Sequence, residues 1–85
     1  MSEEKKIKDT KNLLPLSSLG EGEEGIVYSI SGRRGITNRL AAMGIAPGIK
    51  VKVLINSSGS LLVLANRTRI AIGKGQARKI TIIKP

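Results

Sequence analysis

The chain has 85 residues and a formal net charge of +9, with 40% hydrophobic residues and no histidine or cysteine. This length and apolar content predict one small domain, and the lack of cysteine excludes disulfides and thiolate metal sites. Without histidine the chain lacks the commonest general base and the commonest metal ligand. There is no histidine or cysteine to join its hydroxyl groups in a catalytic dyad or triad, so we predict no enzyme activity, no cofactor and no metal site.

Charge is unevenly distributed along the chain. All six acidic residues lie within the first 24 positions, together with four lysines. From Gly25 onward the chain holds the other 11 basic residues and no acidic one. A body with this charge attracts nucleic acid, anionic lipid or an acidic protein face. The alternative is that the charge only maintains solubility.

Residues 1–13 are polar and mixed in charge, and we predict a disordered N-terminal tail there. This segment lacks the apolar run of a signal peptide. The longest apolar run, Leu61–Ala65, is far shorter than the roughly 20 residues of a membrane span. We therefore expect a cytoplasmic protein without stable membrane insertion.

The first folded segments follow this tail. Leu14–Leu19 contains three leucines that can pack inward, and Ser17 is placed to cap a single helical turn. Gly25–Ser31 is rich in β-branched and aromatic residues, which predicts a strand. Its alternation predicts three inward-facing side chains, Ile26, Tyr28 and Ile30.

A short helix with a sharp stop comes next. Gly44 is suited to end this helix because glycine reaches the left-handed backbone region freely. Leu40 and Ile45 then lie where the hydrophobic contact of a Schellman ending belongs. Pro47 and Gly48 are typical of the two central residues of a type II turn. Apolar side chains at offsets of four and three predict the buried helix face, at Ile36, Leu40 and Met43.

Four further strands complete the predicted fold, at Ile49–Ile55, Leu61–Ala65, Thr68–Ile72 and Lys79–Ile83. In the first of these, residues 49, 51, 53 and 55 are apolar and predicted to face inward, with Lys50 and Lys52 outside. Asn66 and Arg67 predict a tight reversal, and 73–78 a connector of one helical turn. The prediction is a mainly β fold, a five-stranded, partly open barrel with one short helix between strands one and two.

Two local motifs could suggest chemistry. Glu21, Glu23 and Glu24 cluster near a turn, but a hard-cation site needs six or more oxygen ligands, so we interpret them as a solvated turn. The Gly73-Lys74-Gly75 sequence does not have the spacing of a phosphate-binding loop.

Binding surfaces remain as two alternatives. A basic small barrel can bind nucleic acid, but single-strand binders use aromatic stacking, and Tyr28 is the one aromatic residue. The phosphate-contacting face would be Arg33, Arg34, Lys50, Lys52, Arg67 and Arg69. Protein binding is favoured by the helix face formed by Asn38, Ala41 and Ala42, which is flat enough for close approach. Alanine is also simply the best helix former.

The stretch Arg39–Gly48 resembles the FeoA family, with arginine-leucine, a small-apolar-glycine step and a proline-glycine turn before an alternating strand. Leu16–Leu19 with Gly22 resembles the family's opening, and Arg69–Gly73 its closing strands. The resemblance runs from about Leu14 to Ile83. Two departures are the basic segment 74–76, often acidic in relatives, and Ala42, where a charged residue is common.

The resemblance implies an SH3-like barrel over residues 14–85 and a small non-enzymatic cytosolic accessory of ferrous iron uptake. The implied partner is the GTP-binding domain of a FeoB-type membrane transporter. We expect the contacts to come from Arg33, Arg34, Asn38, Arg39, Ala41, Ala42 and Arg69. The same barrel occurs in iron-dependent repressors, so a nucleic-acid-binding or transcription-regulatory module is the alternative. Edge strands of an open barrel also allow weak self-association.

Overall fold

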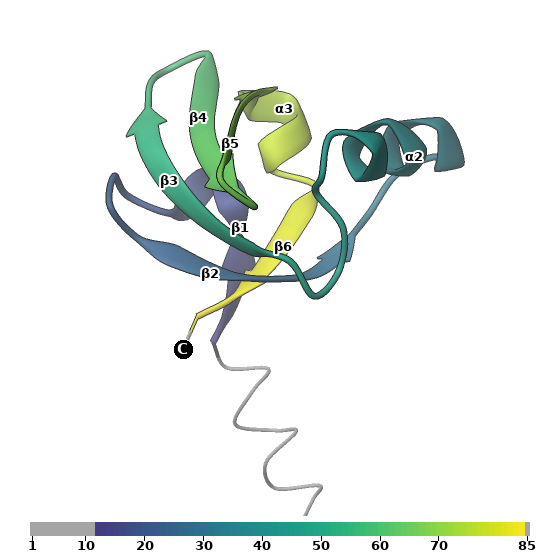
Figure 1. Ribbon diagram of the computed structural model, residues 1–85, viewed down its shortest axis with the longest axis horizontal. Helices are drawn as coiled ribbons and strands as arrows, with labels where there is room; N and C mark the ends of the chain where they lie inside the picture. The colour runs from purple at the N-terminus through teal and green to yellow at the C-terminus, as the bar shows by residue number, and fades with distance from the viewer. Residues whose placement is uncertain (1–11, 85) are drawn as a thin grey trace, which may run out of the picture.

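The computed structural model describes residues 12–84, which form a single antiparallel sheet of six strands in the order β1-β6-β2-β3-β4-β5. The strands are β1 (Leu13–Pro15), β2 (Glu24–Ile30), β3 (Lys50–Asn56), β4 (Ser60–Ala65), β5 (Thr68–Gly73) and β6 (Ile80–Ile83). The helical elements are the 3₁₀-helix η1 (Leu16–Ser18), α2 (Arg34–Ala42) and α3 (Lys74–Ala77). The sheet curls around a core but stays open, because β1 and β5 are its two unjoined edges (Figure 1).

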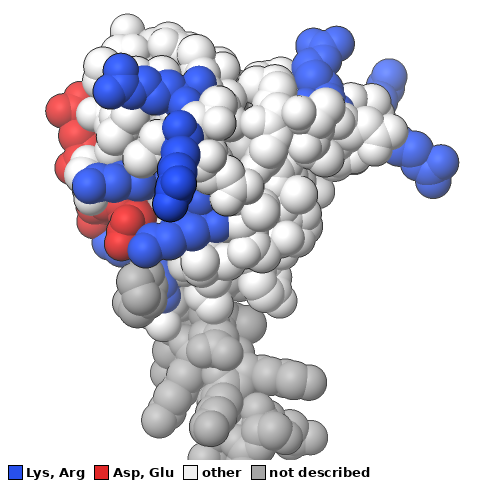
Figure 2. Space-filling model, in the orientation of Figure 1, with Lys and Arg blue, Asp and Glu red and all other residues white. Residues whose placement is uncertain are grey.

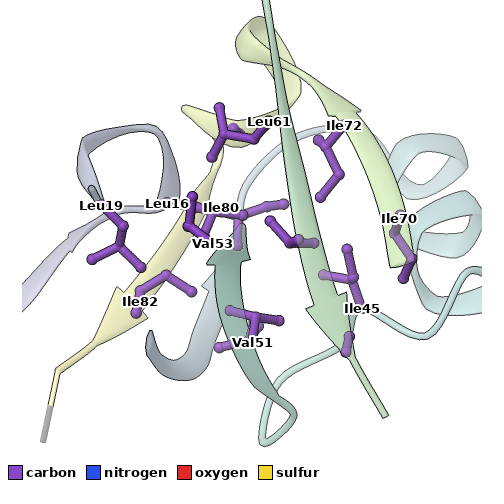
Figure 3. Packing of buried hydrophobic residues seen from close by; sticks show 14 of the residues in the cluster. Leu16, Leu19, Ile45, Val51, Val53, Leu61, Ile70, Ile72, Ile80 and Ile82 are labelled. Atoms are coloured by element: carbon purple, nitrogen blue, oxygen red, sulfur yellow. The ribbon is translucent and has the colours of Figure 1, made fainter. Parts of the chain in front are cut away.

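The core is wholly aliphatic, as the composition predicts. Buried side chains from strands β2 to β6 and from the helical elements pack together between the curled strands (Figure 3). They are Leu16, Leu19, Val27, Leu40, Ile45, Val51, Val53, Leu61, Val63, Ala65, Ile70, Ile72, Ala77, Ile80 and Ile82. No polar or charged residue is buried within the part of the chain that the structure describes. The core therefore supplies stability, and any binding chemistry must lie on the surface.

The mainly β, partly open barrel is confirmed, but it has six strands where five are predicted. The additional strand β1 pairs antiparallel with β6, Leu13 opposite Ile83. Leu13 therefore belongs to the folded domain, and residues 1–11 of the predicted tail lie outside the described part of the chain. Ser17 is not a cap, since it lies inside η1 and Pro15 precedes that helix without a side-chain hydrogen bond. A strand of three residues carries too little local pattern to be recognised without its partner.

The predicted inward face of β2 is wrong. Val27 is 1% exposed and Gly25 is buried, while Ile26 is 36% and Tyr28 52% exposed. The start of β2 therefore has the opposite face inward from the one predicted, and a bulge between Val27 and Ser29, where β2 pairs with β6, reverses the alternation beyond it. Ile30 is half-buried against the core, so one of the three predicted residues packs inward in part. Tyr28 is therefore available at the surface.

In β3 the predicted alternation holds for most of the strand. Val51 and Val53 are buried, and Lys50 and Lys52 are exposed. Ile55 is 50% exposed, against prediction, because the register with β4 shifts between residues 53 and 55. The bulge turns the end of the strand over, so that its last apolar side chain points outward.

The predicted end of the helix is confirmed in detail. Gly44 has a φ of +100°, and Ile45 N–H donates to the Leu40 carbonyl at 2.8 Å. Gly44 N–H donates to the Ala41 carbonyl at 3.0 Å, which completes a Schellman motif. Leu40 is fully buried, but Met43 is 37% exposed and does not belong to the core. Ile45, the residue after the stop, fills the position that the periodicity assigns to Met43.

The turns and connectors also follow the sequence prediction. Gly48 has a φ of +93°, and Ile49 N–H donates to the Ala46 carbonyl at 3.1 Å, as a type II turn requires. Asn66 and Arg67 reverse the chain between β4 and β5. Segment 73–78 contains the single helical turn α3. Among residues 12–84, no helix is long and apolar enough to cross a membrane.

The buried Leu40 side chain is expected to hold α2 in place. Leu40→Ala should lower the free energy of unfolding by about 2–5 kcal/mol, because it leaves a cavity in a close-packed core. Met43→Ala is the matched control and should cost under about 1 kcal/mol. Urea unfolding of both variants measures the difference. Equal midpoints for Leu40→Ala and the unmodified protein would contradict the assignment.

The close pairing of β2 with β6 leaves no space for a side chain at Gly25. A Cβ added there would lie 2.3 Å from Ile82 Cγ2 and 2.9 Å from the Ile83 carbonyl oxygen. Gly25→Ala should therefore destabilise the protein by about 1–3 kcal/mol. Gly35→Ala, where no atom lies within 4 Å, should instead stabilise helix α2 by up to about 1 kcal/mol. If both substitutions shift the thermal midpoint in the same direction, the close approach of β6 to Gly25 does not determine the stability of the protein.

Candidate functional site

The exposed face of α2 is the candidate binding surface. Leu40 is the helix's one buried residue, and Figure 1 shows α2 projecting at the side of the sheet. Asn38, Arg39, Ala41 and Ala42 are all exposed. A helix of nine residues is too short to be stable alone in water, where about 12–15 residues are needed. Its attachment through Leu40, the half-buried Ile36 and the Schellman stop therefore leaves the opposite face of the helix available.

Positive charge gathers on this helix. Arg33 and Arg34 lie at its N-terminal end, and Arg39 lies in its last turn. Among the described residues, no carboxylate forms an ion pair with any of these arginines. Figure 2 shows Lys and Arg side chains standing out at the right, where α2 lies, and the acidic side chains at the opposite side. The helix is therefore a cationic projection suited to an acidic surface.

The structure brings six of the seven predicted contact residues together, on α2 and at its N-cap. Arg69 lies elsewhere, on β5. Its neighbour Ile70 is buried, so the alternation places Arg69 on the outer face of the sheet. Strand pairing puts it opposite Leu64, which in turn lies opposite Lys52. Arg69 therefore belongs with the basic residues of the sheet.

A surface that the sequence does not predict lies outside β2 and β6. Ile26 and Ile83 contribute apolar lining to an open groove of about 520 Å³, which Lys50 and Lys84 also line. Ile26 reaches this surface because β2 faces the opposite way from its predicted phase. Ile26 lies before the bulge between Val27 and Ser29, and no local signal in the sequence marks which face of this part of β2 turns inward. Tyr28 is exposed because it shares this outward phase.

The acidic turn before β2 is held by contacts within the chain. Glu23 accepts hydrogen bonds from Gly20 N–H at 2.6 Å and from Lys84 Nζ at 2.5 Å. Glu21 accepts from Asn56 N–H at 3.1 Å, and Glu24 lies 3.3 Å from Lys50 Nζ. In residues 12–84, no group of three or more Asp, Glu, His or Cys side chains could hold a metal ion. These carboxylates therefore fasten the turn to the sheet.

The fold is an open barrel of six strands with a short helix before β3, and it places the chain in the class of small SH3-like β domains. Within this class the chain belongs to the FeoA family, since the model of the FeoA domain matches residues 14–84. An Fe(2+) transport protein A of Methanocaldococcus jannaschii is 41% identical to this chain over 70 residues. The alignment covers 82% of this chain and 85% of the relative.

Solved structures agree with this membership. A crystal structure of an iron uptake regulatory protein, FeoA, has a TM-score of 0.82 and 34% identity, with 86% of this chain and 99% of that chain covered. FeoA of Stenotrophomonas maltophilia, solved with zinc and described as an SH3 domain protein, has a TM-score of 0.70 and 24% identity, with coverage of 81% and 88%. A manganese-dependent transcriptional repressor has a TM-score of 0.80 and 21% identity, and the match covers 86% of this chain but 42% of the repressor. The last two likenesses show the fold alone.

The Glu23 contacts predict an acid-sensitive turn. The hydrogen bond from Lys84, followed by the Gly20 N–H and the Lys84 charge, holds the pKa of Glu23 below its ordinary value of 4.5. The unfolded chain therefore binds the proton more readily than the folded one, and stability falls as pH drops below about 4.5 through the folded pKa. Lys84→Met should return the pKa of Glu23 toward its ordinary value, as followed by NMR titration of the carboxyl carbon.

Glu23→Gln serves as the second variant for this prediction. Removing the titrating group should flatten the dependence of unfolding free energy on pH in the acid range. An unchanged slope in Glu23→Gln, together with an unshifted titration in Lys84→Met, would show that the ion pair does not persist in solution.

Proposed function

We propose that this protein is a non-enzymatic, cytoplasmic accessory of ferrous iron transport that binds the GTP-binding domain of a FeoB-type transporter through helix α2. Membership of the FeoA family and the name of the M. jannaschii relative support the role in Fe(2+) transport. The observation that carries the proposed contact is the exposed, cationic face of α2, attached to the barrel chiefly through Leu40.

The composition of this face suits contact with another protein. Ala41 and Ala42 have no side-chain atoms beyond Cβ, so a partner backbone or aromatic ring can approach the helix closely. Arg39 lies in the same last turn of the helix as this small-residue area, and Arg33 and Arg34 lie at the other end of α2. Arginine presents a planar set of donors that matches carboxylates in a bidentate geometry. The surface therefore combines a flat area at the C-terminal end of α2 with charged side chains beside it and at the other end of the helix.

The size and charge of the face determine the kind of complex. One exposed side of a nine-residue helix provides a small contact area, which is typical of transient complexes. Exposed arginine residues increase the association rate with an acidic partner more than they increase the affinity. Because these side chains are exposed, added salt should slow association. A transient, salt-sensitive complex is consistent with an accessory that acts on its partner and leaves.

Nucleic-acid binding by a regulatory module is the alternative. It is favoured by the net charge of +9 and by the exposure of Tyr28, at 52%, which leaves one aromatic ring available for stacking. The likeness to a manganese-dependent repressor adds no support, because it shows the fold alone. Titration with mixed oligonucleotides at two salt concentrations tests this alternative. Tight binding near physiological salt with a steep salt slope would favour it over protein docking.

Ala42→Glu is the sharpest test of the proposed contact. The new carboxylate adds bulk and negative charge to the flat area, so affinity for the purified GTP-binding domain should fall at least about tenfold, equivalent to about 1.4 kcal/mol. Calorimetric titration measures the change. Ala71→Glu makes the same chemical change on exposed β5 and should leave the affinity within about twofold.

Two outcomes would overturn the proposal. One is the absence of binding between the unmodified protein and the GTP-binding domain. The other is an equal loss of affinity in Ala42→Glu and Ala71→Glu, since the contact would then not depend on α2. Thermal melts of both variants verify that they remain folded.

A further inference from the structure

A second basic surface lies on the outer face of the sheet, away from α2. It is an open groove of about 320 Å³ between β3 and the turn that joins β4 to β5. Leu64 contributes apolar lining. The charged and polar lining residues are Lys50, Lys52, Asn66, Arg67 and Glu24. Figure 2 shows Lys and Arg side chains meeting beside acidic ones on the left side of the molecule, apart from the group at the right.

The charges in this groove do not cancel. Glu24 lies 3.3 Å from Lys50 Nζ, so the one lining carboxylate is already paired with one lining lysine. Within the described part of the chain, no carboxylate forms an ion pair with Lys52 or Arg67. Three cations and one anion leave a surplus of two positive charges. This surplus equals the charge of a phosphate dianion.

The backbone at Arg67 is an independent sign of function. Asn66 has a φ of +50° and Arg67 a φ of +65°, the left-handed pair of a type I′ hairpin turn. Asparagine tolerates this region, but the second position ordinarily carries glycine, because a Cβ is disfavoured there. Arginine at this position costs stability that glycine would not. Strained positions of this kind concentrate at functional sites, where the side chain is retained for what it binds.

We propose that this groove binds a phosphate group, with Arg67 as its principal ligand. The Arg67 guanidinium can donate two parallel hydrogen bonds to phosphate oxygens, Lys52 supplies a point charge, and the Asn66 amide supplies a further donor. The small volume suits one phosphate group better than an extended polymer. This site does not depend on the proposed function, because it uses no residue of α2.

The first experiment is an NMR titration of the ¹⁵N-labelled protein with inorganic phosphate, at constant ionic strength maintained with sodium chloride. Shifts should concentrate on the amides of Lys52, Asn66 and Arg67. Arg67→Gln should weaken phosphate binding at least about fivefold. Arg39→Gln removes the same charge from exposed α2 and should change the binding less than about twofold. Equal effects of the two variants would mean attraction to net charge alone and would overturn the site.

The second experiment separates strain from binding. Arg67→Gly relieves the left-handed backbone and removes the guanidinium, so it should raise the thermal midpoint while weakening phosphate binding as much as Arg67→Gln does. A lowered midpoint would overturn the argument that Arg67 is retained for a ligand.

The source of the phosphate is tested with vesicles. Sedimentation with phosphatidylglycerol vesicles, compared with phosphatidylcholine vesicles, shows whether a lipid headgroup occupies the groove. A loss of binding in Arg67→Gln that exceeds the loss in Arg39→Gln identifies the headgroup as a ligand. If the protein binds free phosphate but the two variants bind vesicles equally, the ligand of the groove is a soluble phosphate compound. If neither phosphate binding nor vesicle binding falls more in Arg67→Gln than in Arg39→Gln, the proposal is overturned.

Discussion

The contact between Leu40 and Ile45 across the Gly44 stop is the interaction on which the rest of the molecule depends. It buries the last apolar side chain of α2 in the same core as β5, where Ile70 lies beside the stop. It also turns the chain into the Pro47-Gly48 turn and so sets where β3 begins. A helix too short to persist alone is thereby fixed at its C-terminal end, the half-buried Ile36 packs against the core one turn earlier, and the outer face of the helix stays exposed. The binding surface of α2 is thus a consequence of how little of the helix the core requires.

Features determined by neighbouring residues could be predicted from the sequence. The Gly44 stop, the Gly48 turn and the Asn66-Arg67 reversal each require a backbone conformation that particular residue types favour. Features determined by distant pairing could not. Strand β1 exists because β6 offers it an edge, and the bulges in β2 and β3 arise where the curved sheet must bend. After its bulge β3 changes phase, which is why Ile55 is exposed although the alternation assigns it to the core. In β2 the strand faces the opposite way from the prediction already before its bulge, with Gly25 and Val27 inward, which is why Tyr28 is exposed.

The same distinction applies to the candidate sites. The face of α2 could be predicted because helical geometry alone places Asn38, Ala41 and Ala42 opposite Leu40. The position of Arg69 and the groove around Arg67 required the strand register. Lys52 and Arg67 are 15 positions apart in sequence, and the antiparallel pairing of β3 with β4 brings them to one groove. The sequence therefore identifies the basic residues, but the strand register is needed to divide them into the surface of α2 and the groove around Arg67.

This division has a consequence for how the molecule behaves with its own copies. The three described acidic residues lie in the turn before β2 and at the first residue of that strand, and they are engaged there by Asn56, Lys84 and Lys50. They leave the arginines of α2 and of the β4–β5 turn without compensation. Edge strand β5 begins next to that turn and itself carries Arg69, so a second copy approaching this edge meets like charge. Such charge is a common protection of open sheets against edge-to-edge pairing. The surplus that attracts anionic partners thus also opposes association through the β5 edge, and salt should weaken both effects together.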